Sequence, residues 1–208
     1  MSTTTRKVVF TMKKDFRVYL RPLKEGDGDV SIHWRRNDEI WKTMIGPRYF
    51  VSHAYEKQWV TATAAGREDQ RVLAICRKDT HDLIGFVYLT QIDRQHRTAF
   101  SGKLIGMPEA WSMGYGPEAT LLMLYQAFME MGLERIESRQ MVWHHAARRS
   151  VEKLGYQKEG ILRRAVFKDG VFHDMSVLSL LKSEFLPWLD VYRFPGETHK
   201  RSREEEST

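Results

Sequence analysis

Cysteine is nearly absent from this sequence of 208 residues: Cys76 is the single example, so no disulfide can form within the chain. Cys76 lies in an apolar run, residues 72–76, and that context favours burial over metal binding. Clusters of cysteine and histidine with the spacing of zinc ligands are missing as well. The sequence therefore predicts neither a structural disulfide nor a metal centre.

Long apolar runs are also missing. The first 30 residues contain no apolar block of the kind that a signal peptide needs. No stretch reaches the roughly 18 apolar residues of a transmembrane helix. We therefore expect a cytoplasmic protein without a membrane-spanning segment. Hydrophobic residues make up 42% and aromatic residues 12% of the chain, which is typical of a globular protein, and the length suits one domain.

Acidic residues are outnumbered, with 27 against 33 lysines and arginines, which gives a net charge of +6 and a pI of about 9.4. That balance favours an anionic partner, such as nucleic acid, a phosphate-rich cofactor or a nucleotide-linked substrate. The basic residues are dispersed along the chain and form no single stripe, so the charge argues against nucleic acid as the partner.

Alternation of apolar residues and turn signals predict the order of the elements. The predicted strands are 16–20, 72–77, 83–92, 98–105, 136–143, 160–167 and 171–180, and the predicted helices are 30–36, one that Ser52 caps, 117–131 and 146–154. Hairpin turns are predicted at residues 78–82 and at Asp169-Gly170. The order indicates a mixed α/β (α+β) fold, antiparallel except for one parallel crossover around the central helix.

Domain boundaries follow from the ends of this pattern. Residues 1–15 are polar and basic and read as a flexible lead, and residues 16–186 hold all the predicted elements. Residues 187–208 form a C-terminal extension, for which we expect disorder after about residue 195 because the tail is polar and charged.

The loop Ser112-Met113-Gly114-Tyr115-Gly116 precedes the central helix. The first turn of a helix has free N–H groups and a positive dipole end, so such a loop is an anion-binding site. Gly114 and Gly116 permit a left-handed backbone or a close approach, and Pro117 suits the first helical position. An ordinary junction with two glycines is the alternative. The further glycine of a dinucleotide fingerprint and the lysine of a phosphate-binding loop are absent.

Further motifs surround that loop over residues 17–184. They are Arg21-Pro22-Leu23, Trp34-Arg35-Arg36-Asn37-Asp38, Ile84-Gly85, Ile92-Asp93, Trp111 to Gly116, Glu118-Ala119, Glu152-Lys153-Leu154-Gly155-Tyr156, Glu159-Gly160, Asp169-Gly170 and His173-Asp174. In order and spacing the sequence resembles the GNAT acyltransferases, and within them the RimJ/RimL-like N-acetyltransferases. The resemblance implies a GNAT-like twisted mixed sheet of six or seven strands with a central V-shaped splay, flanked by about four helices.

The resemblance also implies a cosubstrate, acetyl-CoA or another acyl-CoA, that lies in the V and needs no metal. Backbone groups of Lys103, Leu104 and Ile105 would pair with its pantetheine arm. The pyrophosphate would bind at Ser112 and at the N–H groups of Met113, Gly114, Tyr115 and Gly116. An acyl group would then pass to a primary amine by direct attack on the thioester.

The side chains that serve catalysis in the family are replaced here. Val151 stands at the usual tyrosine, His144 and Ala147 at an asparagine and a serine, and Val166 at a glutamate. A water chain, a nonstandard side chain or weak catalysis would each explain this pattern. His144 and Ser150 are the candidate catalytic residues, and His144 is also a candidate hydrogen-bond partner of pantetheine. His145 points to another face than its neighbour, so only one of the two histidines enters the cleft.

The acceptor amine is left open by the sequence. Trp34 and Asp174 are candidate substrate-binding residues, with core packing and orientation of a hairpin as their alternatives. A protein N-terminus, an amino sugar, an antibiotic and another small amine are all compatible, whereas the basic balance argues against polycations. A noncatalytic CoA-binding sensor or scaffold and a nucleic-acid-binding module are the alternative functions. Dimers are common in the resembling family, so a homodimer is an open expectation.

Overall fold

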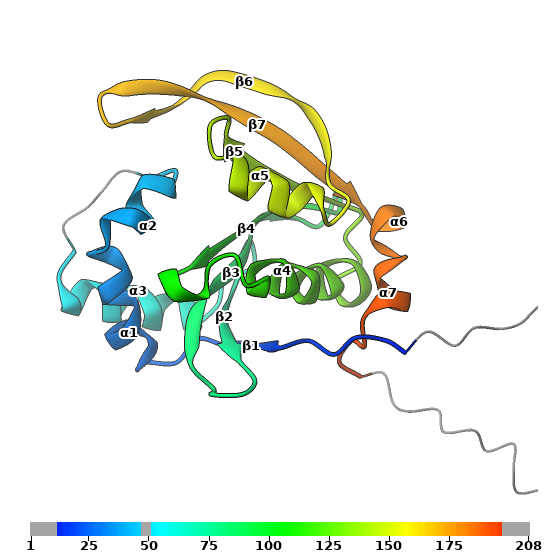
Figure 1. Ribbon diagram of the computed structural model, residues 1–208, viewed down its shortest axis with the longest axis horizontal. Helices are drawn as coiled ribbons and strands as arrows, with labels where there is room; N and C mark the ends of the chain where they lie inside the picture. The colour runs from blue at the N-terminus through cyan, green and yellow to red at the C-terminus, as the bar shows by residue number, and fades with distance from the viewer. Residues whose placement is uncertain (1–11, 47–50, 197–208) are drawn as a thin grey trace, which may run out of the picture.

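The computed structural model describes residues 12–46 and 51–196 (Figure 1). A single sheet of seven strands has the order β1-β2-β3-β4-β5-β7-β6. The strands are β1 Val18–Pro22, β2 Arg71–Arg77, β3 Leu83–Asp93, β4 Thr98–Ile105, β5 Arg135–Met141, β6 Gln157–Lys168 and β7 Val171–Leu181. Neighbours run antiparallel except β4 and β5, which are parallel. The predicted mixed fold with one parallel crossover is confirmed.

The two parallel strands separate soon after they meet. Thr98, Ala99 and Phe100 of β4 pair with residues 135–137 of β5, and no pairing continues beyond them. The rest of β4, up to Ile105, and the rest of β5, up to Met141, therefore diverge. This divergence is the V-shaped splay that the GNAT resemblance implies.

The helices form two groups (Figure 1). Helices α1 Asp27–Arg35, α2 Asp38–Thr43 and α3 His53–Ala64 lie together, apart from the central α4 Tyr115–Tyr125 and from α5 His145–Glu152; the short α6 Lys182–Phe185 and α7 Trp188–Val191 follow β7. Ser52 caps α3 as predicted, because its side chain accepts a hydrogen bond from the N–H of Tyr55. Helix α2 was not predicted, since six residues are too few to show a helical period. No helix in the described ranges is long and apolar enough to cross a membrane.

The central helix begins earlier than predicted. Gly114 is its N-cap with a left-handed φ of 87°, so helical geometry starts at Tyr115. Pro117 is thus the third helical residue and not the first, which still lies in the turn that needs no N–H of its own. The end of the predicted helix is a π-helical turn, Gln126–Glu130, before Gly132 with a φ of 69°.

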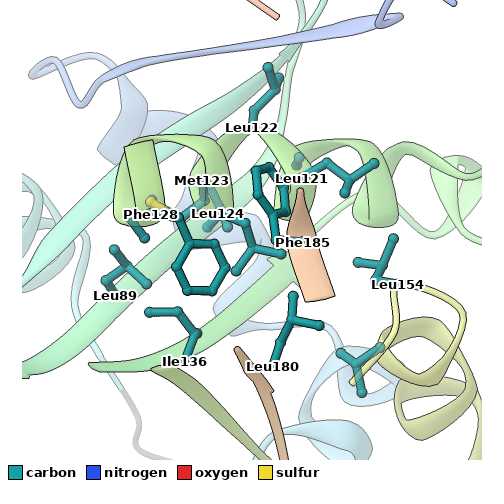
Figure 2. Packing of buried hydrophobic residues seen from close by; sticks show 14 of the residues in the cluster. Leu89, Leu121, Leu122, Met123, Leu124, Phe128, Ile136, Leu154, Leu180 and Phe185 are labelled. Atoms are coloured by element: carbon teal, nitrogen blue, oxygen red, sulfur yellow. The ribbon is translucent and has the colours of Figure 1, made fainter. Parts of the chain in front are cut away.

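Helix α4 is buried on almost all sides, as its composition predicts (Figure 2). Leu121, Leu124 and Phe128 are at most 1% exposed and belong to one cluster with Ile136 and Leu180 from the sheet. A second cluster, built around Trp34, Ile40, Val60 and Phe86, lies among α1, α2, α3 and the strands. Side chains on β4 alternate between the two clusters, because Ile105 packs on the first and Leu104 on the second. The sheet therefore separates an α4 face from an α1–α3 face.

Residues beyond the expected domain end at 186 contribute to the core. Phe194 is 2% exposed and its ring stacks on Tyr125 at a centroid distance of 4.8 Å. Tyr192 stacks on Phe16 at 4.6 Å. The expected flexible lead, apart from its last residues, and the expected disordered tail lie outside the described residues.

Candidate active site

The loop before α4 presents free backbone donors. Ser112 and Gly114 have left-handed φ values of 61° and 87°, which turn the chain sharply into the helix. Within residues 12–46 and 51–196, the N–H groups of Gly114, Tyr115 and Gly116 have no hydrogen-bond acceptor. These donors and the positive end of the α4 dipole make the loop a site for an anion.

Arg17, which is distant from this loop in the sequence, holds the loop in place by hydrogen bonds. Its Nε and its backbone N–H each donate to a carboxylate oxygen of Glu118 at 2.7 Å, and its Nη2 donates to the carbonyl of Met113 at 2.9 Å. Glu118 lies in the first turn of α4 and is 5% exposed. Because Arg17 neutralises that carboxylate, the acid does not repel an anion at the loop. Sequence reasoning missed Arg17, which is 101 residues from its partner.

Two arginine side chains pack on Tyr115 at the start of α4. The guanidinium groups of Arg17 and Arg77 lie over the ring of Tyr115, at 5.0 and 5.8 Å from its centroid. Cations at these distances interact favourably with the ring face and hold it in place. Arg77 is paired with Asp79 and Arg17 with Glu118, so each guanidinium that packs on Tyr115 has its own carboxylate.

The backbone of β4 alternates between the V and β3. The carbonyl of Ser101 accepts from Ser138 of β5 at 3.2 Å, and the carbonyl of Ile105 accepts from the indole of Trp111 at 2.8 Å. Both carbonyls thus face away from β3, and so do the backbone groups of Lys103 between them. The carbonyl of Leu104 instead lies against Gly85 of β3. Of the three residues expected to contact pantetheine, Lys103 and Ile105 present backbone to the V, and Leu104 does not.

The side chain of Lys103 enters the V beneath the start of α4. A Cβ on Gly116 would stand 3.0 Å from its Cε. Among the described residues its ammonium has no hydrogen-bond or carboxylate partner. Burial lowers the pKa of Lys103 to about 8, so the amine is mainly protonated at neutral pH and close to titrating. The structure therefore places an unpaired cation directly beside the anion site.

His144 lies across the V from β4, at the N-cap of α5. Burial first, and then the charges of Lys103 and His145, lower the pKa of His144. Its imidazole is therefore neutral at neutral pH and can accept a proton. Its neighbour His145 is exposed.

The structure also defines the environments of Ser150, Val151 and Asp174, which the sequence analysis singled out. Ser150 on α5 has a buried Oγ without a partner in the described part of the chain. Val151, at the position of the family's tyrosine, is 4% exposed and packs in the core. The carboxylate of Asp174 accepts from the N–H of Arg164 at 2.7 Å and so fixes an irregular part of the β6–β7 hairpin, which is the orienting role.

A chain of polar groups that the sequence did not suggest lines the inner part of the V. The hydroxyls of Tyr156 and Ser101 are 2.9 Å apart, and the amide of Gln140 donates to Ser138 Oγ at 2.7 Å. Burial raises the pKa of Tyr156, so its hydroxyl keeps its proton. The Oε1 of Gln140 is buried and has no partner in the described ranges. A buried acceptor of this kind fits a ligand that carries amide N–H groups.

On the opposite face of the sheet lies a cavity of about 240 Å³. It is lined by Ser31, Trp34, Arg35, Ile40, Trp41, Met44, Glu56, Trp59, Gln70, Val72, Phe86, Tyr88, Thr90 and Leu104. Trp34, the sequence candidate, is 5% exposed and covers Gly106 just past β4. Leu104 belongs to both β4 and the cavity wall, so the cavity adjoins the strand that borders the V. Across the described residues no group of three metal-ligating side chains gathers.

Known proteins share this architecture. A family profile described as the acetyltransferase (GNAT) domain matches residues 17–157. The uncharacterized N-acetyltransferase YoaA of Bacillus subtilis is 28% identical over 176 residues, which cover 84% of this chain and 98% of that protein.

Solved structures agree with the sequence matches. The spermidine N-acetyltransferase of Vibrio cholerae in complex with CoA and spermine superimposes with a TM-score of 0.73 at 25% identity, covering 82% of this chain and 98% of that one. A GNAT acetyltransferase from Bacillus anthracis gives 0.72 at 18% identity, over 82% and 98% of the two chains, and shows the same fold. These matches support neither the noncatalytic CoA-binding alternative nor the nucleic-acid alternative.

Proposed function

The chain belongs to the GNAT acetyltransferases, and we propose that it transfers an acetyl group from acetyl-CoA to the primary amine of a small molecule. One observation carries this proposal: the free N–H groups of Gly114, Tyr115 and Gly116 open onto the splay between β4 and β5. An anion site at the mouth of an unpaired strand edge fits a molecule with a pyrophosphate at one end and an amide-bearing arm at the other.

The residues present fit that cosubstrate. The N–H groups of the loop hold the pyrophosphate, and the Lys103 ammonium, which has no partner among the described residues, adds a positive charge beside them. Ser112 and Met113 belong to the same turn and complete the phosphate site. Backbone groups of Lys103 and Ile105 pair with the pantetheine arm. Acetyl-CoA, once bound, supplies the thioester that the amine attacks.

The amine approaches from the α1–α3 face. The cavity there adjoins β4 through Leu104, while the anion loop lies on the α4 face of the same strand. Two reactants that enter from opposite faces of a sheet meet where the sheet is open. Their proximity in the V supplies much of the rate, as direct transfer between two bound molecules requires.

The amine must lose a proton before it attacks, and the departing thiolate must gain one. We propose His144 as the group that accepts the proton, directly or through water, because its imidazole is neutral and borders the V. Ser150, whose buried Oγ lacks a partner in the described part, is a second candidate for this relay. The protonated hydroxyl of Tyr156 is placed to donate toward the V.

Finer assignments from the sequence remain proposals. We propose membership of the RimJ/RimL-like subgroup and a cytoplasmic location from the sequence pattern, and a homodimer because dimers are common in the family that the sequence resembles. Asp174 is best explained by its bond to the N–H of Arg164, so we propose no contact with the acceptor for it.

Calorimetry of the full chain with CoA tests the cofactor site, and thiol release from acetyl-CoA in the presence of primary amines tests the transfer. We expect saturable CoA binding and amine-dependent thiol release. Absence of CoA binding would exclude this function, and binding without turnover on any amine would favour a noncatalytic CoA-binding protein.

A further inference from the structure

Five aromatic side chains of the described residues line the cavity. Trp34 from α1, Trp41 from α2 and Trp59 from α3 face Phe86 and Tyr88 of β3 across it. The rings also pack on each other, with Trp34 and Trp59 at 5.1 and 5.8 Å from Phe86. At about 240 Å³ the cavity is below the usual range of roughly 300–1,000 Å³ for drug-sized ligands, so it suits a compact molecule.

The charged groups in the cavity wall already satisfy each other. Glu56 is the one carboxylate among the described lining residues, and it is 1% exposed. Its two oxygens accept from Ser31 Oγ at 2.6 Å and from Arg35 Nε at 2.9 Å. The lining thus has no net charge and, within the described residues, no carboxylate that is free to pair with a ligand.

Cations border the same space. The guanidinium of Arg35 lies 5.3 Å from the ring of Trp59 and 5.9 Å from that of Trp41. The ammonium of Lys168, from the β6–β7 hairpin, donates to the carbonyl of Trp41 at 2.9 Å and is 6% exposed as a residue. Arg35 is paired with Glu56, and the ammonium of Lys168 lies 4.0 Å from the carboxylate of Asp169. A ligand with several ammonium groups would therefore find no free carboxylate among the described lining residues, which makes its burial unfavourable.

The inner end of the cavity adjoins the splay. Leu104 lines it, and the ring of Tyr88 lies directly under Gly102, where a Cβ would stand 2.3 Å from the ring. Gly102 and Leu104 flank Lys103, whose backbone faces the V. A single amine at this inner end would therefore be next to the V while the body of the molecule lies among the tryptophans.

We propose that the acceptor is a small monoamine with an aromatic or bulky apolar body, of the arylalkylamine type, and that polyamines are poor acceptors. This inference rests on the proposed function, because it assigns the cavity to the acceptor. It also separates this chain from the Vibrio cholerae neighbour, which was crystallised with spermine. The difference follows from the Glu56–Arg35 pair, which leaves no counter-charge for a polycation among the described lining residues.

The inference is tested by the binding of amines to the full chain, measured by calorimetry with and without CoA. The probes are phenethylamine and tryptamine, with spermidine as the polycation and butylamine as a small amine without a ring. We expect the two arylalkylamines to bind at least tenfold more tightly than spermidine and butylamine. Equal or tighter binding of spermidine, or no arylalkylamine binding, overturns the inference. The CoA titration is separate, so loss of CoA binding would instead contradict the proposed function.

A charge variant supplies a sharper test. Arg35→Gln leaves Glu56 without its cation, and we expect spermidine affinity to rise at least fivefold. The double variant Arg35→Gln/Glu56→Gln is the matched control: it removes both charges and should show no such gain. A gain in the double variant, or none in the single variant, contradicts the assignment of Glu56.

An aromatic variant covers the case in which the charge variants fail to fold. Trp59 is half-buried, so Trp59→Leu removes one aromatic wall of the cavity and keeps an apolar side chain at that position. We expect phenethylamine affinity to fall about tenfold or more while CoA affinity stays the same. Unchanged phenethylamine binding in Trp59→Leu would show that the ligand lies elsewhere.

Discussion

Lys103 on β4 extends beneath Gly116 on α4, and a Cβ at Gly116 would stand 3.0 Å from its Cε. This contact joins the two parts of the proposed cofactor site: the free N–H groups of the helix start and an ammonium without a partner in the described residues. Three of the predictions below, those on Gly116 and on Lys103, follow from it.

Substitution at Gly116 tests the anion site. In Gly116→Glu the new carboxylate occupies the site and pairs with Lys103, so we expect CoA affinity to fall by about a hundredfold or more. Gly116→Ala is the matched control, because the Lys103 tip can shift by a few tenths of an ångström and should allow near-normal binding. Calorimetry measures both, and equal affinity in the two variants would place the anion elsewhere.

Removal of the Lys103 charge should weaken CoA and change its pH dependence. A charge-assisted contact with phosphate contributes about 1.5–3 kcal/mol, so Lys103→Met should bind CoA roughly tenfold to a hundredfold more weakly at pH 7. In the parent protein, affinity should decline as pH rises above about 8, where Lys103 loses its proton. Lys103→Met should lack that decline. It also serves as the reference for any pH effect that comes from ionisation of CoA itself. An identical pH profile in both proteins would argue against the ammonium.

The same variant should be more stable without ligand. The pKa of Lys103 is lower in the folded chain than its ordinary 10.5, so the unfolded chain binds more protons between about pH 8 and 10.5. The stability of the parent should therefore rise with pH through that window. Lys103→Met removes the cost of the buried charge, about 1–3 kcal/mol at pH 7, and flattens that rise. Urea unfolding at pH 7 and 10 measures both effects, and a less stable variant at pH 7 would contradict the burial argument.

Arg17 should support the loop more than Arg77 does, although both guanidiniums lie over Tyr115. Arg17→Gln leaves the buried Glu118 without its cation. We expect the unfolding free energy to fall by about 1–3 kcal/mol, a range that already allows for solvent screening of the exposed Arg17. CoA affinity should fall as well, because the unpaired carboxylate borders the anion site. Arg77→Gln is the control, since its partner Asp79 is exposed. Chemical unfolding and calorimetry that rank the two variants in the opposite order would refute this role.

His144 should matter for turnover where His145 does not. General base catalysis contributes roughly a hundredfold or more, so His144→Ala should lower kcat by about that factor. Burial and the charge of Lys103 lower the pKa of His144. In the plot of kcat against pH, the midpoint of the acid limb should therefore lie below the usual histidine pKa of about 6.5. His145→Ala, at the exposed neighbour, should keep rate and profile. A normal acid limb in His144→Ala would assign the base to water or to another group.

Much of the fold could be predicted because its signals are local. The bounds of β4, Thr98–Ile105, match the prediction. The anion loop also follows from neighbouring residues, namely two glycines before a helix. Short elements such as α2 are missed by this reasoning, since fewer than two helical turns show no period.

The rest of the site depends on contacts between distant residues. Nothing near Arg17 in the sequence indicates Glu118, and nothing near Lys103 indicates that its amine lies under Gly116. Whether the backbone groups of Leu104 face β3 or the V depends on which edge of β4 pairs with β3, and strand alternation alone does not decide that. Trp34 is a substrate-binding candidate from the sequence, but the cavity that it lines joins three helices to β3, so only the folded chain shows which residues share that cavity.

The splay of β4 from β5 has one more consequence. An unpaired strand edge ordinarily attracts any extended chain that can match its donors and acceptors. Here α4 and α5 lie over the opening (Figure 1), so an incoming molecule must be thin, extended and rich in amides to reach it. The gap would thus select a ligand by its shape and by the spacing of its hydrogen-bonding groups, whatever reactive group it carries. A cosubstrate bound there in the proposed way would take the place of a missing strand and would tie the two halves of the sheet together.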